Sequence, residues 1–352
     1  MNNVSPLPAP TRAPVLSLVV LSFRRFEFTT GPCLATLACA LVAPGVELIL
    51  VDNASDDGTA QRCAAWAAAH PSAHYAPQAT NLGFAGGMNA GVAAATGEWV
   101  CLVNSDTLFP TGAIAALLQT LAQVPADVAM VGPVTNAAGN GQHLALPGTA
   151  MAQVIDIGTA AMRAPTGLLT PTYRTDFFCV AVRRSVWQQL DGLAPVFGLG
   201  YFEDFDFSLR LRRAGFQQVI AEDVFVAHLG SATFAGLGDG QKALMRRNRR
   251  LLRERHPDAS FEHVRLGNAQ ALRHLMAIAQ SHGWTDALRQ RAAWRLAALL
   301  HNEARSPFKR WRWRWSTRDI RRALAVEHIA ARFPTGDVDW SPTPNVTPSP
   351  SL

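Results

Sequence analysis

Short apolar runs that alternate with helix-like segments are the feature that most constrains the fold of this chain. Apolar runs typical of buried strands lie at residues 15–21, 47–52, 99–103, 128–132, 177–183 and 219–228. Helix-like segments of alanine-rich or amphipathic composition lie between them, at residues 59–70, 86–95 and 111–123. This alternation predicts an α/β fold, with a mostly parallel central sheet and helices on both of its faces.

Two further segments and a change of composition complete the expected organisation. Residues 135–175 are rich in Gly, Pro, Thr and Ala without a clear period, which predicts a long loop. Residues 204–215 open with acidic and close with basic side chains before Gly215, which favours a helix over a strand. After residue 240 the pattern changes to Arg/Ala/Leu-rich helices, expected at 242–256, 261–281, 284–304 and 316–332.

The net charge of +6 hides an uneven distribution along the chain. Residues 1–240 hold 11 Lys/Arg and 17 Asp/Glu, whereas residues 241–332 hold 21 and 7. We therefore expect a flexible tail at 1–14, an α/β domain at 15–240, a basic helical region at 241–332 and a disordered tail at 333–352. The basic region 241–332 is expected to bind a different partner from the acidic residues 1–240. An anionic membrane surface is one candidate.

Cysteine usage and the first residues bear on the compartment. The five cysteines form no C-x-x-C pair and lie mostly in apolar contexts, so we expect buried, reduced thiols rather than disulfides or a zinc site. No segment has 18 consecutive apolar residues, and residues 1–14 lack the apolar core of a secretory signal. The expected location is the cytoplasm, with peripheral association at the inner face of the cell membrane.

The polar segment Asn104-Ser105-Asp106 directly follows the apolar run 99–103. An acidic side chain at the carboxyl end of a strand lies where open α/β sheets bind nucleotides and metals. Carboxylates suit hard cations, so Asp106 is a candidate ligand of Mg²⁺ or Mn²⁺, and Asn104 and Ser105 are candidate nucleotide contacts.

Polar residues near the second expected strand extend this edge. Asp52 and Asn53 end that strand and can accept from and donate to a pyrimidine base. A glycine-rich segment follows, and glycine lets a backbone approach phosphate or ribose closely. Its candidate nucleotide contacts are Asn81, Gly83, Gly86 and Asn89.

An acidic cluster and a histidine lie further along the chain. Glu203 and Asp204 are adjacent, with Asp206 close behind, and mutual repulsion raises the pKa of at least one such carboxyl toward a value useful to a general base. The same acids could instead only enrich a helix N-terminus. His228 follows an apolar run and precedes Leu229-Gly230-Ser231.

Taken in this order, these segments resemble family 2 glycosyltransferases with the A-type nucleotide-sugar fold, over about residues 15–235. The resemblance implies that Asp106 holds a divalent metal, that His228 is a metal or diphosphate ligand, and that Asp204, beside Glu203, is the catalytic base. It also implies that Asp52 contacts the base of the nucleotide. Asn104 departs from the family's first aspartate and lends no charge to the cation.

The motif style looks most like bacterial rhamnosyltransferases. This implies an inverting, metal-dependent enzyme that moves a sugar from a dTDP- or UDP-sugar to a glycan or lipid-linked acceptor in cell-surface polysaccharide synthesis. One alternative is a nucleic-acid-binding or membrane-docking protein with an inactive transferase fold. A sugar nucleotidyltransferase is disfavoured because no lysine-bearing glycine loop follows the first strand.

Overall fold

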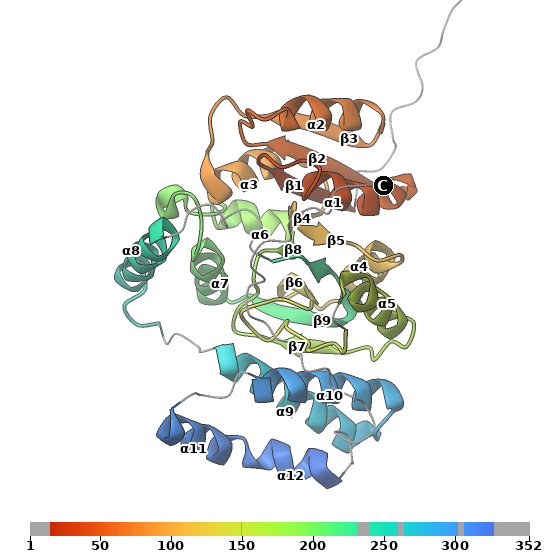
Figure 1. Cartoon of the computed structure of the whole chain (residues 1–352), viewed down its shortest axis with the longest axis vertical. Helices are drawn as coiled ribbons and strands as arrows, with labels where there is room; N and C mark the ends of the chain where they lie inside the picture. The colour runs from red at the N-terminus through yellow and green to blue at the C-terminus, as the bar shows by residue number, and fades with distance from the viewer. Residues whose placement is uncertain (1–14, 149, 231–238, 260–263, 302–305, 327–352) are drawn as a thin grey trace, which may run out of the picture.

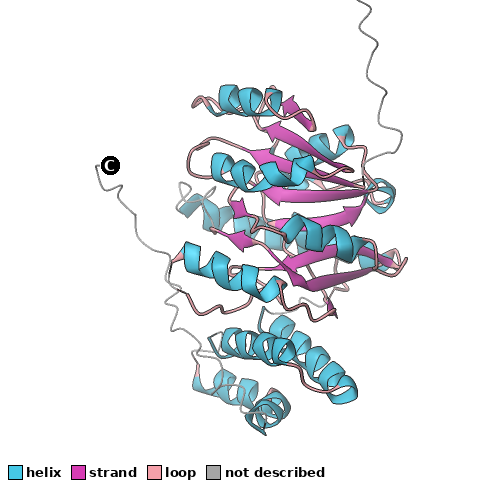
Figure 2. Ribbon diagram, turned by 90° about the vertical axis from the view of Figure 1, so that its right-hand side faces the viewer, coloured by secondary structure: helices cyan, strands magenta, loops and turns pink. Residues whose placement is uncertain are grey.

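The structure is a computed structural model that describes residues 15–148, 150–230, 239–259, 264–301 and 306–326. The expected tails at 1–14 and 333–352 lie outside the described residues. Helices pack across a central sheet, and the helices after residue 263 lie beyond one edge of that sheet (Figures 1 and 2).

The main sheet has eight strands in the order β3-β2-β1-β4-β8-β6-β9-β7. Their bounds are β1 Leu16–Ser22, β2 Val46–Asp52, β3 Ala73–Pro77, β4 Trp99–Asn104, β6 Val128–Val134, β7 Leu169–Pro171, β8 Cys179–Arg183 and β9 Gln217–Phe225. The pairs β2–β3, β1–β2, β1–β4 and β6–β9 are parallel, whereas β8 runs antiparallel to both neighbours and β7 to β9. The predicted mostly parallel α/β sheet is confirmed.

Helices cover both faces of this sheet. One face buries Leu18 and Val20 of β1 against α1 (Thr30–Leu37) and α4 (Ala113–Leu121), and the other buries Val19 against α3 (Gly83–Ala94). The latter face also carries α6 (Arg184–Gln189) and α7 (Glu203–Arg213), whereas α2 (Thr59–Ala68) packs on β2 and β3. The predicted helix at 204–215 is confirmed as α7, with acidic side chains in its first turn and basic ones in its last.

The expectation of a long loop at 135–175 is wrong. Helix α5 (Met151–Met162) and strand β7 lie within it, and α5 buries Val154 and Ala161 against β9. Two of the three buried positions of α5 hold small residues, Gly158 and Ala161, and β7 has only three residues, so neither element shows a clear hydrophobic period in the sequence. The sequence also gave no sign of β3, whose residues are half-buried or exposed.

The C-terminal part holds α8 (Asp239–Arg255), α9 (Val264–His282), α10 (Asp286–His301), α11 (Pro307–Ser316) and α12 (Arg318–Val326). Four of these were expected, α12 with its end placed at 332, whereas α11 was not. Helices α9 to α12 enclose an apolar core of their own that includes Leu272, Leu296 and Trp313.

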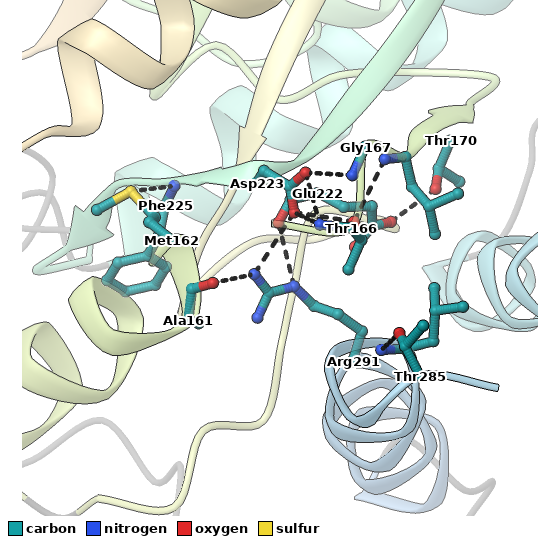
Figure 3. Close-up of polar contacts among 12 residues, drawn as sticks. Ala161, Met162, Thr166, Gly167, Thr170, Glu222, Asp223, Phe225, Thr285 and Arg291 are labelled. Atoms are coloured by element: carbon teal, nitrogen blue, oxygen red, sulfur yellow. Dashed lines mark hydrogen bonds and ion pairs between the residues drawn. The ribbon is translucent and has the colours of Figure 1, made fainter. Parts of the chain in front are cut away.

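Two buried arginines of α10 attach this part to the sheet. Arg295 is fully buried and forms an ion pair of 2.5 Å with Glu222 of β9. Arg291 donates to the carbonyl oxygens of Glu222 and Ala161 and lies 3.8 Å from Asp223, as Figure 3 shows. Part of the positive charge counted in 241–332 is therefore buried rather than on a basic surface.

The cysteine side chains are mostly buried. Cys33, Cys63, Cys101 and Cys179 are buried and free, as expected, but Cys39 is exposed, which corrects the prediction for that residue. Among the described helices, none is long and apolar enough to cross a membrane.

Candidate active site

The candidate site forms where β4 ends beside a small second sheet. After Asn104 the chain turns through Ser105 and Asp106 into β5 (Thr107–Leu108), which pairs antiparallel with β10 (Ala227–His228). This pairing places His228 opposite Thr107, so that the Nε2 atom of His228 lies 3.4 Å from Oδ1 of Asp106. The two expected ligands, 122 positions apart in the sequence, are therefore neighbours.

The surroundings of His228 define its protonation. Its Nδ1 lies 2.9 Å from the carbonyl oxygen of Ala137, which can only accept, so Nδ1 carries a proton. Nε2 faces the Asp106 carboxylate. When protonated it can donate a hydrogen bond to that carboxylate, and when deprotonated its lone pair can bind a cation together with the carboxylate. Burial disfavours the charged imidazole, but the hydrogen bond and negative charge of Asp106 outweigh burial and raise the pKa of His228. Its ring stacks on Phe178 at 5.1 Å, which fixes its plane.

This pair fits a divalent cation in chemistry. A buried carboxylate suits Mn²⁺ or Mg²⁺, and an imidazole whose other nitrogen is held by a carbonyl is a common metal ligand that suits Mn²⁺ better than Mg²⁺. Among the described residues, no group of three or more His, Cys, Asp or Glu side chains could hold a metal ion. A cation held here would take its remaining ligands from phosphate oxygens and water.

Glu203 and Asp204 open helix α7 after a strained segment of backbone. Tyr201 and Phe202 have φ values of 72° and 78°, a left-handed conformation that is costly for bulky side chains. Oε2 of Glu203 is buried and has no hydrogen-bond partner among the described residues. Oδ1 of Asp204 accepts from the amide of Phe205 at 2.8 Å. The strained turn thus presents two adjacent carboxyl groups at the start of a helix.

Both carboxyl groups hold their protons more tightly than usual. Burial, followed by the charge of Asp204, raises the pKa of Glu203 to about 8. Burial also raises the pKa of Asp204 to about 6, with Arg174 lowering it and Asp176 raising it. Near neutral pH this leaves Asp204 ionised and able to take a proton, beside a Glu203 that is mostly protonated.

Asp206 has a different, structural environment. It is fully buried, and its carboxylate accepts from Arg210 of α7 and from Arg255 and His256 at the end of α8, each at 2.8 Å. Burial opposes ionisation, but these bonds and charges lower the pKa of Asp206. A saturated carboxylate of this kind joins α7 to α8 and is not free to act as a base.

Helix α8 also holds the strained turn at Tyr201 and Phe202 in place. The sequence does not predict this contact. The side-chain amide of Asn248, fully buried, donates to the carbonyl oxygens of Phe197, Gly200 and Tyr201 at 2.7, 2.8 and 3.2 Å. In the sequence, Asn248 is only an asparagine within an arginine-rich helix. Such a pattern does not indicate which backbone groups its side chain will bind.

A cavity of about 490 Å³ brings together four of the expected residues from separate elements, whereas Asp52, Ser105 and Asp106 are not among its lining residues. Asn104, His228, Glu203 and Asp204 line it. Its other lining residues are Phe84, Ala137, Ala138, Gly139, Arg174, Asp176, Phe177, Phe178, Tyr201, Phe202, Gly230 and Met245. Arg174 and Asp176 form an ion pair of 2.8 Å beside Asp204. The sequence analysis did not single them out, because Arg174 lies in the expected loop at 135–175 and Asp176 directly follows it.

The expected nucleotide contacts divide into two groups. Asp52 ends β2 beside the parallel strand β1, and its buried Oδ1 has no hydrogen-bond partner within the described part of the chain, which suits a bound base. In contrast, Asn53 bonds to Asn81, Leu82 and Gly83, and Asn89 makes two bonds to Leu193. We assign the amides of Asn53 and Asn89 to holding the turn and helix in place.

The glycine-rich segment also differs from a simple loop. Helix α3 begins at Gly83, three residues earlier than expected, so Gly86 lies inside the helix. A Cβ on Gly83 would collide with the carbonyl oxygen of Gly198, and a Cβ on Gly91 with side chains of β1 and β2. These two glycines permit close packing, whereas the first turn of α3 still lies near the end of β2 through Asn53.

Comparison with known families agrees with this geometry. The model of a family described as "glycosyltransferase like family 2" matches residues 13–251, about two thirds of the chain. The chain belongs to this family. It is therefore a glycosyltransferase, and its sheet and helices are those of the A-type nucleotide-sugar transferase fold.

Individual relatives of this glycosyltransferase are distant. Uncharacterized proteins from Mycobacterium bovis and Mycobacterium tuberculosis are each 26% identical over 231 residues, which cover 63% of this chain and 77% of theirs. A solved mannosyltransferase from Pyrobaculum calidifontis, in complex with GDP-Man and Mn²⁺, aligns with a TM-score of 0.49 and 17% identity. That alignment covers 93% of this chain and 90% of the mannosyltransferase.

Proposed function

We propose that this glycosyltransferase is an inverting, metal-dependent enzyme that uses a dTDP- or UDP-sugar, with rhamnose as the favoured sugar. The acceptor is a hydroxyl group of a glycan or lipid-linked glycan in cell-surface polysaccharide synthesis. The observation that carries the chemistry is the cavity in which Asn104 and His228 lie with Glu203 and Asp204.

Each residue has a proposed task in this reaction. Asp52 receives the base of the nucleotide, and Asn104 and Ser105 lie on the path from the base to the diphosphate. Asp106 and His228 would hold a Mg²⁺ or Mn²⁺ ion, and that ion would supply positive charge to the diphosphate leaving group. Asp204 removes the proton of the acceptor hydroxyl as that oxygen attacks the anomeric carbon.

Glu203 and Arg174 complete the cavity. A mostly protonated Glu203 can donate a hydrogen bond to a sugar oxygen, which an ionised carboxylate cannot do. Arg174 lies near Asp204, where its charge favours the ionised base. We also place α8 with the catalytic unit, because it holds both the strained turn and Asp206.

A thermal-shift panel tests the proposed donor and metal. UDP, dTDP, GDP and CDP are each added with Mn²⁺, with Mg²⁺ or with EDTA. A ligand at 100 times its Kd adds about 2.7 kcal/mol to the free energy of unfolding, which is readily measured. We expect UDP or dTDP to stabilise the protein most and to need the cation. A larger effect of GDP, or no effect of any cation, would contradict this assignment.

The pH dependence of kcat/KM tests the base. A base works only when deprotonated, so we expect kcat/KM to fall as the pH drops through about 6, the pKa of Asp204. Arg174→Gln removes a charge that lowers this pKa, so the acid limb should move to higher pH. Asp176→Asn removes a charge that raises the pKa and should move the limb to lower pH. Shifts in the same direction for both variants would show that another group controls the limb.

A further inference from the structure

Helix α11 exposes an aromatic face to solvent. Phe308, Trp311 and Trp315 are 66%, 63% and 59% exposed. They follow an i, i+3, i+7 spacing, so they share one side of the helix. Among the described residues only two other large hydrophobic side chains, Phe28 and Val42, are more than half exposed.

The opposite side of α11 anchors the helix to the protein. Trp313 lies two residues from Trp311 and from Trp315, about 160° around the helix from each. It is only 8% exposed and packs with Ile320 and Leu324 of α12 in the core of the C-terminal helices. The aromatic face therefore lies on the side of α11 opposite Trp313. Helices α11 and α12 lie at the end of the molecule farthest from β3 (Figure 1).

Positive charge surrounds this face. Residues 307–326 contain seven Lys/Arg and one acidic residue, Asp319, which is paired with Arg273 at 2.9 Å. The arginines at positions 310, 312 and 314 of α11 are exposed, and the Arg318 guanidinium lies 4.8 Å from the centre of the Trp315 ring. Tryptophan and arginine together match the apolar and charged layers of a lipid headgroup region.

We propose that the aromatic face of α11 is the surface by which this protein binds an anionic lipid bilayer. The three aromatic rings enter the headgroup layer, and the surrounding arginines contact lipid phosphates. The apolar residues of this face lie along one side of a short helix. A nearly flat anionic surface can contact all of them at once, without a pocket. This inference adds a location to the proposed function and does not depend on the transfer chemistry.

Co-sedimentation of the full chain with vesicles tests the proposal. We expect binding to vesicles of phosphatidylcholine with phosphatidylglycerol, little binding to phosphatidylcholine alone, and release by high salt. The triple variant Phe308→Ser, Trp311→Ser, Trp315→Ser should bind the anionic vesicles about tenfold more weakly or worse, since binding scales with buried apolar area. The matched double variant Phe28→Ser, Val42→Ser should bind like the unchanged protein.

Other occupants of this face give different results. If the unchanged chain ignores anionic vesicles, or if the triple variant binds them normally, the proposal is wrong. If the triple variant instead converts a dimer to a monomer in light scattering with unchanged vesicle binding, the face is a contact between two copies. Binding that appears only after removal of residues 327–352 would show that this segment covers the face and would also overturn the proposal.

A measurement without vesicles separates this inference from the catalytic proposal. The thermal shift with UDP or dTDP and Mn²⁺ should be the same for the triple variant and the unchanged protein. If the unchanged protein shows this shift but binds no vesicles, the docking proposal fails and the proposed transferase site stands.

Discussion

Asp204→Asn should lower kcat by about 10²–10⁴-fold, the usual contribution of a general base. The amide keeps the size of the carboxylate and can still accept from the amide of Phe205, so the fold and the affinity for the nucleoside diphosphate should be retained. Transfer is measured at saturating donor and acceptor, with binding measured by calorimetry. Asp191→Asn is the matched control, because Asp191 is exposed and has a φ of 57°, which asparagine tolerates well.

Near-normal kcat in the Asp204→Asn protein would place the base elsewhere. Glu203 would then be the next residue to test, since its Oε2 is buried in the site and has no hydrogen-bond partner among the described residues. Asp206, which the sequence also offered, is a poor second choice because Arg210, Arg255 and His256 already bind its carboxylate.

Asp106→Ala should weaken Mn²⁺-dependent binding of UDP or dTDP by at least about 10–100-fold, the loss that removing even an outer partner of a metal ligand causes. Binding of the bare nucleoside should change little, because a carboxylate can approach a diphosphate closely only through a cation. Calorimetry with and without Mn²⁺ separates the two contributions. His228→Ala should cause a smaller loss of the same kind.

Two comparisons make this result decisive. Asp106→Asn keeps the shape of the side chain but removes its charge, so it should reproduce most of the loss if cation binding is the cause. An equal loss for nucleoside and diphosphate would instead show that Asp106 supports the turn between β4 and β5 and does not hold a metal.

The fold could be predicted wherever the sequence carries a strong local pattern. The central strands are continuous apolar runs because helices cover both of their faces, and α7 has the charge order that a helix dipole favours. The sequence does not predict helix α11, because its alternating arginine and tryptophan match neither the apolar period of a helix nor that of a half-buried strand. Its burial depends on Trp313 packing against α12, a contact that local composition does not contain.

The candidate site could be predicted only in part, for a related reason. Asp106, His228, Glu203 and Asp204 come from short segments with recognisable residues at the ends of strands or at the start of a helix. The contributions of Arg174 and Asn248 depend on contacts between distant segments, and Asn248 bonds to the strained turn at Tyr201. Asn53 and Asn89 stay predicted nucleotide contacts, but their amide groups also bond to neighbouring backbone, a role that the sequence does not distinguish from ligand binding.

The buried ion pairs between the sheet and the C-terminal helices limit how this protein can be shortened or recombined. A chain cut at residue 251, where the family match ends, would lose Arg255 and His256 and leave buried Asp206 with Arg210 alone. It would also lose Arg291 and Arg295, which bind Glu222, and would uncover the part of β9 that these arginines contact. A chimera with a relative must therefore exchange both members of each pair, since the family's sequence limits are not limits of independent folding.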